Sequence, residues 1–185
     1  MTTANAAREP PRYDRLTVAL HWMTAALVVL LWVIGQTADW LPHGAFRTGY
    51  WSTHVVGGFL LAGVLVWRLV WRATRGRRLP AADTWALHVV AKATHYGLYV
   101  LLLTAVSLGI INAFVRGYSL YDLVHLPQLG DREWRHAVTD WHGLAANILL
   151  ALAGIHAGAA LVHHYAWHDA VLRHMWPRRP HPSPR

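Results

Sequence analysis

Histidines inside apolar stretches are the residues of this chain whose type and spacing could do chemistry. The chain has 14 His, and each of its four long apolar stretches carries at least one. Ionisable groups within membrane spans are costly and usually functional. His142 and His156 are 14 residues apart, which is about 21 Å along a helix and only about 40° around its axis. One helix face therefore presents an imidazole near each end.

Two further histidines fall at matching depths. His54 lies a few residues inside the outer end of the second stretch, and His21 about one and a half turns from the inner end of the first. We therefore expect His54 opposite His142 at an outer level and His21 opposite His156 at an inner level. Paired neutral imidazoles across a bundle core suit a six-coordinate haem iron. The spacing predicts two haem sites.

Other interpretations of these histidines stay open. Any single one could be a core histidine that is hydrogen-bonded between helices, and His95 competes with His21 as the inner ligand. Zinc is a weaker alternative, because it needs three or four ligands at one depth. Several glycines would leave room for a flat macrocycle; they are Gly57, Gly58, Gly143, Gly154 and Gly158.

The elements that must position these histidines are four apolar stretches, each about as long as a membrane-spanning helix. They are Leu16–Gln36, Ser52–Val70, Leu87–Ile111 and Val138–His163. Their charged residues lie near the ends, where side chains reach the interface. The pattern predicts an all-α integral membrane protein, a bundle of four transmembrane helices. It forms a single domain over residues 1–185 with a disordered Pro/Arg-rich tail at about 177–185.

The charge distribution predicts the orientation of this bundle. Thirteen of the 17 Lys and Arg lie on the side that holds both termini and the loop between the second and third stretches, and four lie opposite. By the positive-inside rule both termini are cytoplasmic. The basic excess is then a topology signal, which argues against a nucleic-acid partner. Cysteine is absent, which excludes disulfide scaffolds, iron–sulfur clusters and c-type haem attachment.

Four segments together resemble the bacterial cytochrome b561 family, and most closely its superoxide oxidase (superoxide:ubiquinone oxidoreductase) branch. They are YDRLTVALHW around His21, WSTHVVGGFLLAGVLVWRLVWR around His54, WHGLAANILLALAGIHAGAALVHHYAWHD around His142 and His156, and the ending VLRHMWPRR. The resemblance implies a multi-pass protein of the bacterial inner membrane with two haem b groups ligated by His21, His54, His142 and His156. It also implies oxidation of superoxide to dioxygen at the periplasmic face, with the electrons passing to ubiquinone.

The residues that would serve these substrates are hypotheses. For the superoxide anion we expect a local basic funnel from Arg47, Arg116, Arg132 and Arg135, with the outer loop of about residues 112–137 as its wall and lid. An inert connector with a short interfacial helix is the alternative for this loop. For the quinone we expect the inner end, because an apolar slot needs a few donors and a proton path. The candidates there are Arg15, Trp22, Lys92, His95 and His163.

Two other functions remain open at this point. The chain could be a haem b electron-transfer subunit that relays electrons between a partner dehydrogenase or hydrogenase and the quinone pool. It could also be a non-redox membrane protein, a transporter or scaffold with structural histidines. If the chain oxidises superoxide, its small-molecule partners are superoxide and ubiquinone, and no partner protein is required.

Overall fold

The computed structural model describes residues 13–75, 85–166, 168, 172 and 175. Four long helices dominate them: α1 (Arg15–Thr37), α2 (Ala45–Thr74), α3 (Trp85–Arg116) and α4 (Trp134–Tyr165). All four are long and apolar enough to cross a membrane. The predicted all-α membrane bundle is confirmed. The predicted Pro/Arg-rich tail lies outside the described residues.

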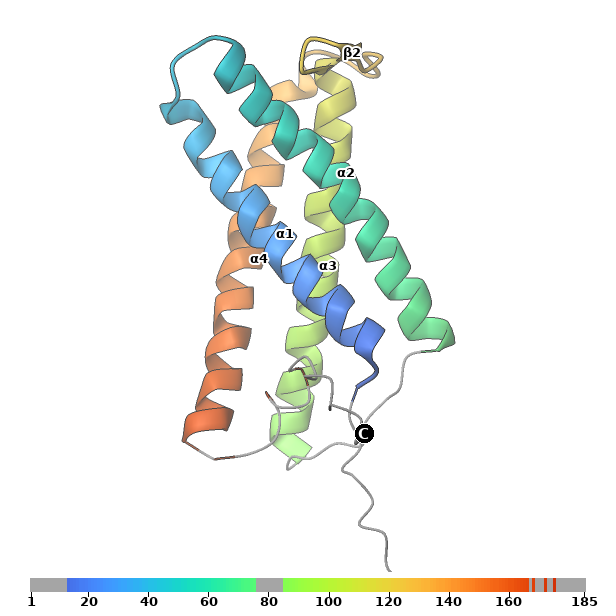
Figure 1. Ribbon diagram of the computed structural model, residues 1–185, viewed down its shortest axis with the longest axis vertical. Helices are drawn as coiled ribbons and strands as arrows, with labels where there is room; N and C mark the ends of the chain where they lie inside the picture. Colours follow the sequence, from blue (N-terminus) through green and yellow to red (C-terminus); the bar gives the residue numbers. More distant parts are fainter. Residues whose placement is uncertain (1–12, 76–84, 167, 169–171, 173–174, 176–185) are drawn as a thin grey trace, which may run out of the picture.

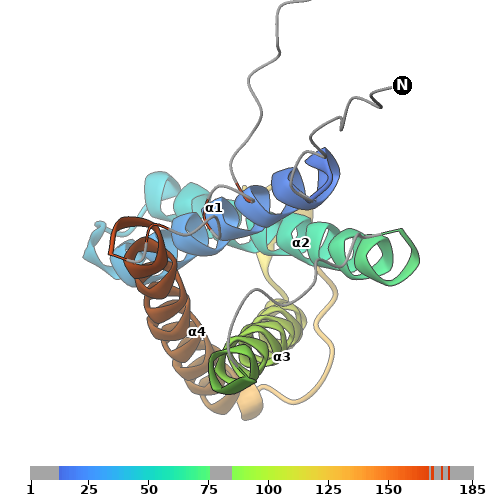
Figure 2. The same cartoon turned by 90° about the horizontal axis from the view of Figure 1, so that it is seen from below.

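The helices form two antiparallel pairs. α1 packs mainly on α2, and α3 packs mainly on α4; the first pair crosses over the second (Figures 1 and 2). The start of α1 and the end of α4 lie at the same end of the bundle; the positive-inside rule predicts this end to be cytoplasmic.

Local sequence signals explain where two of the helices begin. Asp14 caps α1, because its carboxylate accepts hydrogen bonds from the backbone N–H and the hydroxyl of Thr17 at 2.8 and 2.6 Å. Before α2 the chain turns through a short 3₁₀ helix, η1 (Ala38–Trp40), and then Gly44, whose φ of 143° favours glycine. Every helix extends beyond the predicted apolar stretch, since polar turns outside the hydrocarbon remain helical.

The outer connection between α3 and α4 lacks the short interfacial helix of the alternative given for it. It holds a two-stranded hairpin, β1 (Ser119–Leu120) paired antiparallel with β2 (Val124–His125), and no interfacial helix among its described residues. The turn puts Tyr121 and Asp122 at positive φ. The buried Ser52 hydroxyl of α2 accepts a hydrogen bond from the Tyr121 N–H at 2.9 Å. The hairpin is thereby fastened over α2 beside His54.

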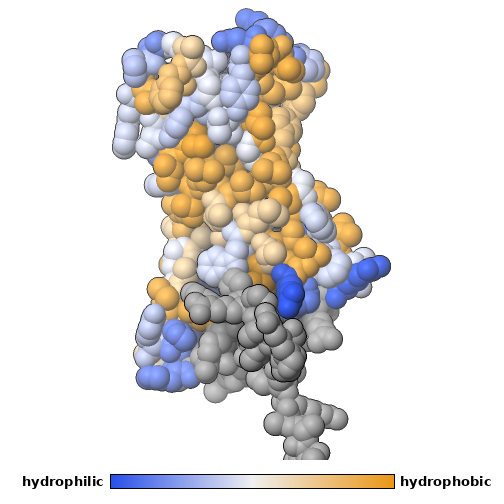
Figure 3. Space-filling view, in the orientation of Figure 1, coloured by the Kyte–Doolittle hydropathy of each residue, from blue (hydrophilic) through white to orange (hydrophobic). Residues whose placement is uncertain are grey.

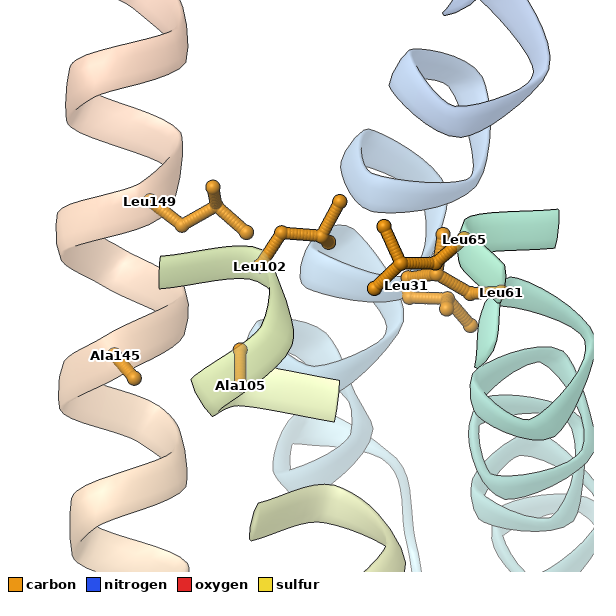
Figure 4. Close-up of a cluster of buried hydrophobic side chains, with 7 residues drawn as sticks. All are labelled: Leu31, Leu61, Leu65, Leu102, Ala105, Ala145 and Leu149. Carbon is orange, nitrogen blue, oxygen red and sulfur yellow. The ribbon is translucent and has the colours of Figure 1, made fainter. Parts of the chain in front are cut away.

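A compact leucine and alanine core occupies the middle of the bundle. Its members come from all four helices and point toward one another (Figure 4); they are Leu31, Leu61, Leu65, Leu102, Ala105, Ala145 and Leu149. At most 28% of the most apolar stretch of any span is buried. The remaining apolar surface gathers over the middle of the molecule (Figure 3), where lipid would cover it.

Candidate functional site

The outer histidines meet across the two helix pairs. The ring centroids of His54 on α2 and His142 on α4 are 6.0 Å apart, and the ring planes are nearly perpendicular at 87°. An imidazole nitrogen binds a first-row metal at about 2.0–2.1 Å with the ring centre about 1 Å behind it, so two opposed ligands have centroids about 6 Å apart. The observed separation therefore fits two imidazoles on opposite sides of one metal ion.

Hydrogen bonds fix the tautomer of both rings. Nδ1 of His54 lies 2.9 Å from the carbonyl oxygen of Leu31, and Nδ1 of His142 lies 2.9 Å from that of Ala105. A carbonyl oxygen can only accept, so Nδ1 carries the hydrogen and donates in each case. In a neutral ring this leaves the Nε2 lone pair free. Such a second hydrogen bond is typical of metal-ligating histidines.

Three histidines gather at the inner level, where we expected His21 opposite His156. The ring that contacts His156 is that of His95 on α3, with centroids 5.2 Å apart. His21 on α1 is close enough to His95 and His156 for electrostatic interaction. The structure thus brings both candidate partners of His156 to one place, and the choice between His21 and His95 stays a prediction.

Arg68 distinguishes the inner level from the outer one. Its guanidinium nitrogen lies 3.1 Å from Nδ1 of His21, and because guanidinium only donates, Nδ1 accepts there. A neutral His21 ring then carries its hydrogen on Nε2, so in this arrangement neither of its nitrogens offers a free lone pair to a metal ion. The same guanidinium lies over the ring of Tyr99, 5.4 Å from the centroid. We did not expect Arg68 at the site. The sequence did offer one indication of its place. Arg68 lies as many residues from the inner end of α2 as His21 lies from the inner end of α1, so the two side chains are at the same depth.

An outer cavity of about 310 Å³ lies between α2 and the hairpin. Its lining residues are His43, Gly44, Arg47, Thr48, Trp51, Tyr118 and Ser119. The Trp51 ring touches the His54 ring edge-on, with centroids 5.6 Å apart. Burial raises the pKa of Tyr118, although Arg116 and Arg47 oppose this shift. Its phenol therefore stays neutral at pH 7 and can donate a hydrogen bond.

The four arginines expected to guide superoxide do not form one funnel. Arg47 lines the cavity, where it forms an ion pair with Asp39 and donates to His43 at 3.1 Å. The other three are held elsewhere by hydrogen bonds: Arg116 by Asn112 and Thr139, Arg132 by Gln128, and Arg135 by the carbonyl of Arg132. The cavity thus brings in only Arg47 of the four.

The five residues expected to bind a quinone are spread over the inner end. His95 contacts His156. The Trp22 ring contacts His21, and its indole N–H donates to the carbonyl of Met175 at 2.8 Å. Trp22 also borders an apolar groove on α1. Arg15 and Lys92 are exposed near the helix ends, and His163 is partly buried near the end of α4.

Four of the five glycines expected beside a macrocycle face open space. Methyl groups placed on Gly58, Gly143, Gly154 and Gly158 would meet nothing within 4 Å, whereas one on Gly57 would lie 2.7 Å from the Leu31 side chain. Gly57 therefore serves close packing of α2 on α1. Room for a macrocycle at these five glycines stays a prediction.

Comparison with known proteins gives a consistent family. A family profile described as prokaryotic cytochrome b561 matches residues 12–178. Cytochrome b561 homolog 1 of Escherichia coli K12 is 29% identical, with 91% of this chain and 98% of the relative covered. Cytochrome b562 of Cereibacter sphaeroides is 30% identical, with 92% and 99% covered. A probable superoxide oxidase of Yersinia pestis is 25% identical, with 91% and 97% covered.

Proposed function

Because the chain belongs to the prokaryotic cytochrome b561 family of haem b membrane electron-transfer proteins, we propose that it oxidises superoxide to dioxygen at the periplasmic face and delivers the electrons to ubiquinone. Two bound haems would supply the one-electron carriers for this reaction. His54 and His142 would hold the outer haem, and His156 with His21 the inner one once His21 gives up its hydrogen bond from Arg68 at Nδ1. His95 is the alternative to His21. The inner membrane of a bacterium is the proposed location.

The observation that carries the proposal is the outer histidine pair beneath the cavity. Two imidazoles 6.0 Å apart, each with Nδ1 donating to a helix carbonyl, have the spacing and tautomer that an iron ligand pair needs. The cavity above them contains Arg47, the neutral phenol of Tyr118 and the Trp51 ring that touches His54. A small anion could enter this cavity, attracted by the guanidinium of Arg47. It would then lie beside the Trp51 ring, which touches His54.

The surroundings of the two levels favour electron flow inward. Carbonyl acceptors make the outer imidazoles more basic ligands, which stabilises the oxidised form of a bound haem. Arg68 places a positive charge beside His21, which disfavours the extra positive charge of the oxidised form at the inner level. The inner level would therefore have the higher reduction potential. Electrons taken from superoxide outside would run downhill toward the quinone inside.

The quinone would bind at the inner end, close to His95 and Trp22. The groove beside Trp22 is apolar, as a quinone ring and its tail require, and its other lining residues are Ala25, Ala26, Val29, Leu30 and Val33. His95 lies against His156 and could donate a hydrogen bond to a quinone oxygen. Arg15, Lys92 and His163 are the other residues proposed to serve the quinone at this end.

The test is the visible spectrum of the purified, oxidised protein during an enzymatic superoxide flux with catalase present. We expect a b-type spectrum that becomes reduced in the superoxide flux. When superoxide dismutase is present from the start, the spectrum should stay oxidised. Arg47→Gln should slow this reduction, whereas the same charge change at the opposite end, Arg75→Gln, should leave the rate unchanged. A b-type spectrum that stays oxidised in the superoxide flux would contradict the proposal and favour the electron-transfer subunit with a protein donor.

A further inference from the structure

The two outer histidines are held by the same arrangement in each helix pair. His54 reaches from α2 to the carbonyl of Leu31 on α1, and His142 reaches from α4 to the carbonyl of Ala105 on α3. Four residues after each accepting carbonyl there is a glycine, Gly35 in α1 and Gly109 in α3. The two instances lie on different helices and involve different rings, so they are independent observations of one geometry.

A side chain at either glycine would crowd one of these rings. A methyl group on Gly35 would lie 3.3 Å from Cε1 of His54, and one on Gly109 would lie 3.0 Å from Cε1 and 3.3 Å from Nδ1 of His142. In a helix the side chain at position i+4 lies beside the carbonyl of position i. Only glycine leaves that side of the carbonyl open to a ring from the neighbouring helix.

Hydroxyl side chains elsewhere in this chain show what happens when that space is filled. Thr24, Thr37 and Ser52 each donate to the carbonyl four residues earlier, at 2.7–2.8 Å. A hydroxyl side chain at i+4 thus takes the carbonyl for itself. At Gly35 and Gly109 the same carbonyl positions are used by His54 and His142 instead.

We propose that Gly35 and Gly109 are positioning residues that expose the carbonyls of Leu31 and Ala105, and so fix the tautomer and ring plane of the two outer histidines. This rests on the proposed haem site at the outer level. It adds two residues that touch neither substrate nor iron. Because Leu31 and Ala105 also belong to the central core, the packing of the bundle and the orientation of the rings depend on the same two residues.

The test compares Gly→Ala and Gly→Ser at both positions with Gly63→Ala. Gly63 lies on α2 nine residues from His54, on the opposite side of the helix, and a methyl group there meets nothing within 4 Å. Alanine in a helix interior is favoured over glycine by about 1 kcal/mol. Weaker helices would therefore not explain a loss of haem in the variants.

The decisive readout is the electron paramagnetic resonance signal of the oxidised outer haem. Perpendicular ligand planes give a strongly anisotropic low-spin signal, and the 87° between the rings predicts one here. Gly109→Ala should shift this signal more than Gly35→Ala, because its methyl group lies closer to the ring. The serine variants should also speed haem loss to excess apomyoglobin, in line with the about 10–100-fold loss of affinity typical when a ligand's outer hydrogen bond is removed.

The possible outcomes separate this inference from the proposed function. Shifted outer-haem signals in the four variants, with Gly63→Ala like the wild type, would support the inference. Wild-type signals in all four variants would overturn it and leave the proposed function standing. It would also be overturned if neither position tolerated substitution while Gly63→Ala accumulated normally, since the glycines would then serve the fold. A wild-type protein without haem would end both proposals.

Discussion

At the scale of single residues, depth along the helices carried most of the sequence argument. It placed His54 with His142, and the structure brings these two rings to 6.0 Å; their role as ligands stays a prediction. It could not decide between His21 and His95, because depth does not specify how α1 and α3 are rotated. The sequence could not predict that the carbonyls of Leu31 and Ala105 accept from these rings, because a backbone acceptor has no sequence signature.

Removing one outer ring should remove one haem. His54→Ala is expected to lose the outer haem and keep the inner one, because the two levels are separated by the leucine and alanine core. The pyridine haemochrome assay on the purified variant measures its haem content. Thr53→Ala, a change at the residue directly before His54, is the matched control. Retention of both haems in His54→Ala would show that this ring is no ligand.

The charge of Arg68 should set the potential of the inner level. Arg68→Gln removes the positive charge beside His21 and keeps a polar side chain at this position. We expect the inner midpoint potential to fall by tens of millivolts, corresponding to on the order of 1 kcal/mol. Redox titration followed by visible spectroscopy measures it, with Arg75→Gln as a control for the loss of one inner arginine. A change confined to the outer haem would refute the assignment.

At the scale of elements, hydropathy was sufficient to find the four spans but not their ends. α2 begins at Ala45, well before the predicted Ser52, because a helix needs no apolar side chains once it has left the hydrocarbon. The hairpin had no detectable signal, since strands of two residues are too short for an alternating pattern. Its place over α2 depends on Ser52 and Thr53, which lie in another element.

The cap of α1 should make stability depend on acid pH. Burial alone would raise the pKa of Asp14, but hydrogen bonds from Thr17 and Trp71 outweigh it and lower the pKa below the ordinary 3.8. The ionised cap therefore stabilises the fold above that pH, and the contribution is lost as the pH falls through the lowered value.

Asp14→Ala should lower the free energy of unfolding by about 1 kcal/mol at pH 7. The difference in unfolding free energy between Asp14→Ala and the wild type should be smaller near pH 3. Thermal denaturation in detergent at pH 7 and pH 3 measures it. Asp14→Asn, which can still cap the helix but does not titrate there, is the control. An equal loss for Asp14→Ala at both pH values would contradict the role given to the carboxylate.

The attachment of the hairpin should depend on Ser52. Ser52→Ala leaves the Tyr121 N–H without its acceptor, which costs about 1 kcal/mol for a partly buried hydrogen bond. We expect faster amide hydrogen exchange across residues 117–126 and a lower melting temperature. Thr53→Ala removes only the exposed contact with the Tyr121 hydroxyl and should change both much less. Equal exchange in the two variants would show that Ser52 does not hold the hairpin.

At the scale of the whole molecule, the bundle separates two histidine levels with an apolar core. The outer level has perpendicular rings on carbonyl acceptors beneath a cavity with Arg47. The inner level has three histidines and Arg68 beside an apolar groove. The composition and the arginine distribution predicted the membrane bundle, but the difference between the two levels depends on contacts between helices and came only from the structure.

The most direct measurement of this account is the haem content of the purified wild-type chain, as moles of haem b per mole of protein. Two histidine levels, each proposed to hold one haem, predict a ratio of two. Redox titration of the same sample should then resolve two components, with the higher potential at the inner level. A ratio of one would contradict the account, because one of the two histidine levels would then have no haem to bind.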